Sequence, residues 1–103
     1  MNENKKEVEQ KLTEMYQRDT NAMILVFAQW CVNHEIDPLV LYQEAYPEQR
    51  ISEELRNMAA LTVPKEEAGE IATDTLLAVL MMFDNERLAT VVQEKADAWK
   101  KSK

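Results

Sequence analysis

Glycine is almost missing from this chain of 103 residues, which contains only Gly69. Glycine is the usual residue where a backbone takes positive φ, as in the tight turns of β-hairpins and in phosphate-binding loops. A sequence with so little glycine therefore favours neither a β-meander nor a glycine-rich nucleotide-binding loop. The shortage predicts an all-α protein, and we expect a compact bundle of four to five helices.

The composition is that of one folded domain. Hydrophobic residues make up 46% of the chain and charged residues 30%, which is typical of globular rather than disordered protein. A domain of this length buries roughly two-thirds of the surface of its unfolded chain, which is enough for one core. We therefore expect a single helical domain over residues 1–103.

Cysteine content and hydropathy indicate a cytoplasmic protein. Cys31 is the only cysteine, so no disulfide forms within the chain, and residues 1–10 are too polar for a signal peptide. The longest apolar stretches, 22–32 and 76–83, are far shorter than the ~20 residues that span a bilayer. We expect neither secretion nor a membrane segment.

Negative charge is concentrated in the middle of the chain. Residues 19–94 contain fourteen acidic and four basic side chains, a net charge of −10, within a total of −7. Such a body repels phosphates, so we expect no direct binding of nucleic acid. A protein partner with a basic or apolar patch fits this charge better. A remaining alternative is an acidic surface that mimics nucleic acid and occupies a DNA-binding protein.

Apolar spacing and capping residues predict helices along the whole chain. The first covers residues 4–34, either as one helix or as two with a break near Asp19, and the absence of glycine and proline favours one. Asp37 and Pro38 are typical of an N-cap and a first helical position. The further predicted helices cover residues 39–46, 52–61 with Ser52 as the N-cap, 65–83, and a last segment that follows Asp84 or Asn85.

Two of these helices are apolar on nearly every face, over residues 22–32 and 76–83. Such a helix is buried on every side, and a domain this small usually has one central helix. We therefore expect one of the two to pack against a second copy in a homodimer, with a monomer as the alternative. The Met81-Met82 pair is interpreted as core filling, or alternatively as an adaptable binding surface. The candidate interface residues are Leu76, Leu77, Leu80, Met81 and Phe83.

Two groups of polar residues at helical spacing are candidate metal ligands, and each also has a simpler interpretation. Cys31 and His34 form half of a zinc motif, but no second pair completes it, so a buried thiol and a surface histidine are the simpler interpretation. Glu67 and Glu70 lie on one side of the predicted helix 65–83. Carboxylates in this arrangement can hold Mg²⁺, and the alternative is an ordinary solvated acidic turn.

Residues 66–101 resemble part of the all-α nucleotide pyrophosphatase (MazG-type) family, because Glu66-Glu67-Ala68-Gly69-Glu70-Ile71 is followed by an apolar helix and a last helix containing Lys95. The resemblance implies that Glu67 and Glu70 are Mg²⁺ ligands and that Lys95 contacts phosphate. The family's second pair of acidic ligands has no counterpart on the preceding helix of this chain.

The sequence leaves the enzyme question open and favours a non-enzymatic protein–protein interaction module, acting as a homodimer and without a cofactor. The alternative is a Mg²⁺-dependent nucleoside triphosphate pyrophosphatase, for which Mg²⁺ would activate water and clamp phosphate oxygens.

Overall fold

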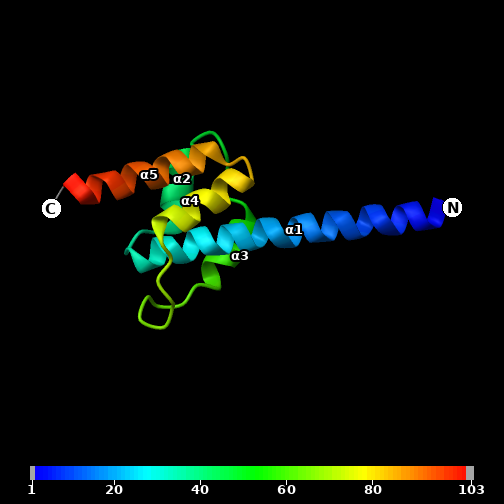
Figure 1. The fold of residues 1–103 in the computed structure, drawn as a ribbon, viewed down its shortest axis with the longest axis horizontal. Coiled ribbons are helices and arrows are strands. Elements are labelled where there is room, and N and C mark those ends of the chain that lie inside the picture. The colour runs from blue at the N-terminus through cyan, green and yellow to red at the C-terminus, as the bar shows by residue number, and fades with distance from the viewer. Residues whose placement is uncertain (1, 102–103) are drawn as a thin grey trace.

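The computed structural model describes the backbone of residues 2–101 and the side chains of residues 18–101. Within this part every regular element is a helix and there is no strand, as the glycine shortage predicts (Figure 1). The five helices are α1 (Asn2–Asn33), α2 (Pro38–Ala45), α3 (Glu53–Ala60), α4 (Thr73–Met82) and α5 (Glu86–Lys101).

Helix α1 is one uninterrupted helix of 32 residues. The polar triplet at residues 19–21 interrupts the apolar pattern but not the helix, because it contains neither glycine nor proline. The C-terminal half of α1 packs among the other four helices, whereas its N-terminal half projects beyond them (Figure 1). This projection gives the molecule its longest dimension of 62 Å.

The predicted capping residues fix the starts of three helices. The Asp37 carboxylate accepts a hydrogen bond from the backbone N–H of Leu39, and Ser52 Oγ accepts one from Leu55. Asn85 Oδ1 accepts from the N–H of Leu88 at 3.4 Å, at the start of α5. Each of these bonds satisfies a helix N–H that has no partner inside its own helix.

Two helices end in the left-handed turn that usually contains glycine. Glu35 after α1 has a φ of 60°, and Asp84 after α4 has a φ of 54°. The bonds from Ile36 N–H to Cys31 O and from Asn85 N–H to Leu80 O close both turns in the Schellman pattern. The chain therefore uses positive φ without glycine, at a cost in backbone strain.

The predicted helix over residues 65–83 is wrong in its first third. Residues 65–72 form turns and irregular backbone, and α4 begins only at Thr73. Pro64 accepts hydrogen bonds from the N–H groups of Glu67 and Ala68, which closes a local turn but does not continue into a helix. We call residues 62–72 the α3–α4 loop.

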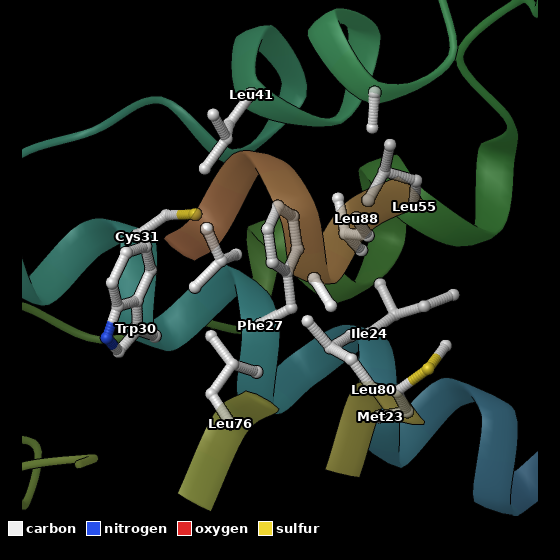
Figure 2. Close-up of a cluster of buried hydrophobic side chains, with 13 residues drawn as sticks. Met23, Ile24, Phe27, Trp30, Cys31, Leu41, Leu55, Leu76, Leu80 and Leu88 are labelled. Atoms are coloured by element: carbon white, nitrogen blue, oxygen red, sulfur yellow. The ribbon is translucent and has the colours of Figure 1, made fainter. Parts of the chain in front are cut away.

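The core lies between α1 and the helices α2, α3 and α4 that it contacts, and Leu88 and Val92 of α5 complete it. Phe27 is fully buried near its centre, with Leu41 of α2 and Leu76 of α4 on different sides (Figure 2). Its ring meets Tyr42 edge to face at 6.4 Å between centroids. The prediction that residues 22–32 are buried on every face holds in part, because six of the eleven residues are buried and four half-buried, whereas Ala22 is exposed.

Candidate functional site

The α3–α4 loop is fastened to α1 by two side-chain amides. Gln29 Nε2 donates to Val63 O at 2.9 Å, and Val63 N–H donates back to Gln29 Oε1 at 3.0 Å. One turn later, Asn33 Nδ2 donates to Gly69 O at 3.3 Å. These bonds satisfy loop backbone that has no helical partner, and they hold the loop away from a helical path.

The two predicted Mg²⁺ ligands lie in this loop and not on a helix. The backbone of residues 65–72 is not helical, so the argument that helical spacing places Glu67 and Glu70 on one face is wrong. Both side chains are exposed. Within the described side chains, no group of three or more histidine, cysteine, aspartate or glutamate residues is arranged to hold a metal ion. Glu70 lines a hollow of about 320 Å³ together with Asn33, His34 and Lys65.

Lys95, the predicted phosphate contact, lies elsewhere on the molecule. Its Nζ atom is 3.7 Å from Glu44 Oε1, which pairs α5 with α2. It does not line the hollow that contains Glu70. The structure therefore shows no contact that joins Lys95 to Glu67 or Glu70.

Cys31 and His34 do not face a common site. Cys31 is fully buried, and burial raises the pKa of its thiol far above the ordinary range. The His34 ring stacks on Trp99 at 4.5 Å between centroids, and Trp99 stacks in turn on Trp30 at 5.4 Å. This contact removes water from the imidazole and lowers the pKa of His34, while the nearby Glu70 carboxylate raises it.

Helix α4 uses a narrow face to pack into the core. Leu76 and Leu80 are fully buried inside the chain, so neither presents a surface to a second copy. The next two residues along the helix are open to solvent, with exposures of 51% for Met81 and 79% for Met82. The interpretation of the methionine pair as core filling is therefore wrong.

A groove of about 490 Å³ runs between α4 and α5. Its apolar lining comes from Leu77, Met81 and Ala89. Four polar residues of α5 complete the α4–α5 groove: Glu86, Thr90, Gln93 and Glu94.

A second hollow, of about 330 Å³, lies on the other side of α4, where α1 leaves the body of the protein. We call it the α1–α4 hollow. The residues that line it are Asp19, Ala22, Met23, Val26, Val79, Met82 and Phe83.

The five candidate interface residues thus separate into three groups. Leu77 and Met81 line the α4–α5 groove, Phe83 lines the α1–α4 hollow, and Leu76 and Leu80 belong to the core. The sequence prediction omitted Met82 and the groove residues of α5. The signal for Met82 was present, because a helix that is apolar all round exceeds what one packing face can bury.

None of the helices in the described residues is long and apolar enough to cross a membrane.

Comparison with known proteins shows the family. No solved structure matches the chain. Uncharacterized protein YxiS of Bacillus subtilis (strain 168) is 55% identical over 87 residues, which are 84% of this chain and 91% of that protein. A family model described as YxiS matches residues 4–97, and the chain therefore belongs to the YxiS family.

Proposed function

We propose that this protein is a non-enzymatic interaction module of the cytoplasm that assembles as a homodimer through the α1–α4 hollow. The observation that carries the proposal is the exposure of Met82, 79%, beside an apolar surface. The fully buried thiol of Cys31 fits a reducing compartment, because it has no partner cysteine.

The α1–α4 hollow is largely apolar. Val79 and Phe83 are half-buried beside Met82, and Ala22 and Val26 of α1 form the opposite wall. Covering a methionine or phenylalanine side chain fully is worth roughly 1.5–3 kcal/mol. Contiguous apolar surface of this kind is typical of a contact with another protein.

The sequence of the projecting half of α1 continues the apolar spacing of this surface. Ala22 and Val26 line the hollow, and the sequence continues their four–three spacing backwards through Met15, Leu12 and Val8, interrupted only by Asp19. Residues 2–17 add ~24 Å of helix at 1.5 Å per residue. Within one chain this half helix lies beyond the other four helices (Figure 1). Most of the stability of a helix in a protein comes from packing of its apolar face, so a partner would stabilise this half helix.

A second copy of the chain supplies a matching surface by symmetry. In a two-fold dimer the same patch meets itself, so the hollow of each copy and its projecting half helix are covered together. The four–three spacing is the pattern by which helices pair in coiled coils. Residues 1–18 contain four acidic and four basic side chains, so this segment carries no net charge that opposes pairing.

The charged groups that the pyrophosphatase alternative requires lie apart on the described surface, which supports a non-enzymatic role. Glu67 and Glu70 lie in the α3–α4 loop, whereas Lys95 pairs with Glu44 on α2. General acid–base or metal chemistry needs such groups within hydrogen-bond reach of one reacting centre.

The proposal is tested by placing a charge at the centre of the proposed contact. Met82→Glu should convert a dimer to a monomer in sedimentation equilibrium, because it would bury an unpaired carboxylate. Leu61→Glu is the matched control, since Leu61 is 60% exposed after α3 and lies outside the hollow. Equal masses for the wild type, Met82→Glu and Leu61→Glu would contradict the proposal.

A further inference from the structure

We propose that the α4–α5 groove binds a basic amphipathic helix of another polypeptide. The inference rests on the proposed role as an interaction module, but not on the homodimer, because the groove lies on the other side of α4 from the α1–α4 hollow. Met81 lines the groove, whereas Met82 lines the hollow.

The floor of the groove is an apolar surface against which side chains of a partner can pack. Leu77 and Met81 of α4 face Ala89 of α5 across about 490 Å³ of space. Ala89 has a small side chain and is only 8% exposed, so it leaves room above the backbone of α5. Methionine adapts to many partner shapes because its thioether chain is unbranched and flexible.

The rim of the groove is acidic and uncompensated. Glu86 and Glu94 line it, and neither takes part in an ion pair with any other described residue. The polar side chains between them are occupied within α5: Thr90 Oγ1 donates to Glu86 O at 2.9 Å, and Gln93 Nε2 donates to Asp97 Oδ1 at 2.9 Å.

Two of the four cations of α5 have their partners in α2 or directly after it. Arg87 binds both carboxylate oxygens of Glu48 at 2.6 and 3.0 Å and lies over the ring of Tyr46. Lys95 pairs with Glu44. Arg87 and Lys95 are therefore engaged by other carboxylates, and Glu86 and Glu94 remain available to a cationic partner.

The spacing along α5 fits a helical ligand. Glu86 and Glu94 are eight residues apart on one helix, or ~12 Å at 1.5 Å per residue. Apolar anchors at positions i and i+7 of an amphipathic helix lie ~10.5 Å apart, so such a helix can seat its anchors on the floor and place lysines beside both carboxylates.

A second copy of this chain supplies that chemistry poorly. Its middle, residues 19–94, carries a net charge of −10, residues 1–18 contain equal numbers of acidic and basic side chains, and only the short segment 95–103, with four lysines and one aspartate, is net basic. A like-charged surface opposes docking to the acidic rim. The charge therefore selects a basic helix from a different polypeptide.

The experiment uses fluorescence anisotropy with a labelled amphipathic peptide of leucine and lysine, and the full-length protein. Glu86→Lys/Glu94→Lys should weaken binding at least tenfold, or about 1.4 kcal/mol. The control Glu66→Lys/Glu67→Lys changes the net charge equally in the exposed α3–α4 loop and should change affinity less than about twofold. If both double variants weakened peptide binding equally, the binding would depend on overall charge and not on the groove, and the proposal would be overturned.

A second pair of variants tests the apolar floor. Met81→Asn should weaken the peptide at least about fivefold, whereas Met82→Asn, one residue along the same helix, should leave the affinity within about twofold. Equal effects of the two substitutions, or no binding by the wild type, would overturn the proposal. Met82→Asn also removes a side chain of the proposed dimer contact. Peptide binding by this variant therefore tests the α4–α5 groove independently of the homodimer.

Discussion

Met81 and Met82 are neighbours in the chain but line different surfaces: Met81 lies in the α4–α5 groove and Met82 in the α1–α4 hollow. Successive residues of an α-helix point about 100° apart, since 3.6 residues complete a turn. With Leu80 turned into the core, the last turn of α4 serves the core and two outer surfaces. The two surfaces can therefore be disturbed one at a time.

The left-handed residue after α4 predicts a stabilising substitution. Asp84 has a φ of 54°, a conformation that costs most residues with a side chain ~1 kcal/mol and costs glycine none. Asp84→Gly should raise the free energy of unfolding by about 0.5–1 kcal/mol in urea titrations, after allowing for the greater freedom of glycine in the unfolded chain. Ala78→Gly, at an exposed position inside α4, should lower it by about 1 kcal/mol. A loss of stability in both variants would contradict the assignment of strain to Asp84.

The double hydrogen bond between Gln29 and Val63 predicts how the α3–α4 loop is held. Gln29→Ala removes both bonds, so the N–H of Val63 should exchange with deuterium at least about tenfold faster. Gln43 bonds the carbonyls of Tyr46 and Gln49 in another turn. Gln43→Ala should leave exchange at Val63 unchanged, and acceleration by both variants would indicate general loosening.

The stack of His34 on Trp99 predicts a pH dependence. Burial lowers the pKa of His34 in the folded protein, so the unfolded chain takes up the proton first as the pH falls through about 6.5. Stability therefore decreases with falling pH in this range. NMR titration should place the His34 midpoint below its ordinary value, and His34→Gln should remove this part of the decrease. Glu70→Gln should lower the midpoint further, because the Glu70 carboxylate raises it. A midpoint above the ordinary value would contradict the role of the stack.

The irregular backbone around Glu67 and Glu70 predicts a weak response to magnesium. A site of ~1 mM affinity would add about 1.4 kcal/mol at ~10 mM Mg²⁺, or roughly 4–8 °C in the Tm of a domain this small. We expect a shift no larger than that caused by sodium chloride of equal ionic strength. If Mg²⁺ alone raised the Tm by that amount, and Glu70→Gln abolished the increase, the result would support the pyrophosphatase alternative.

Local signals in the sequence were sufficient to predict most of the fold. Asp37 and Ser52 cap the helices that they were expected to cap, and of the two candidates Asp84 and Asn85 it is Asn85 that caps the last helix, since capping depends on a few neighbouring residues. The unbroken course of α1 likewise followed from the lack of glycine and proline.

The sequence failed where contacts between distant residues decide the structure. Residues 65–72 have helical spacing, but Gln29 and Asn33, more than thirty positions earlier, bind the loop backbone at Val63 and Gly69. Such tertiary bonds outweigh a weak local propensity. The sequence indicated that the apolar helix exceeds what one face can bury, but not that Met82 would be the exposed residue, because this depends on which face of α4 packs against α1.

The mass of the wild-type protein in solution tests the central claim most directly. Sedimentation equilibrium from about 1 to about 100 µM should show a species of twice the 12.0 kDa chain mass, with a dissociation constant within or below that range. A mass of 12.0 kDa at every concentration would contradict self-association through the α1–α4 hollow.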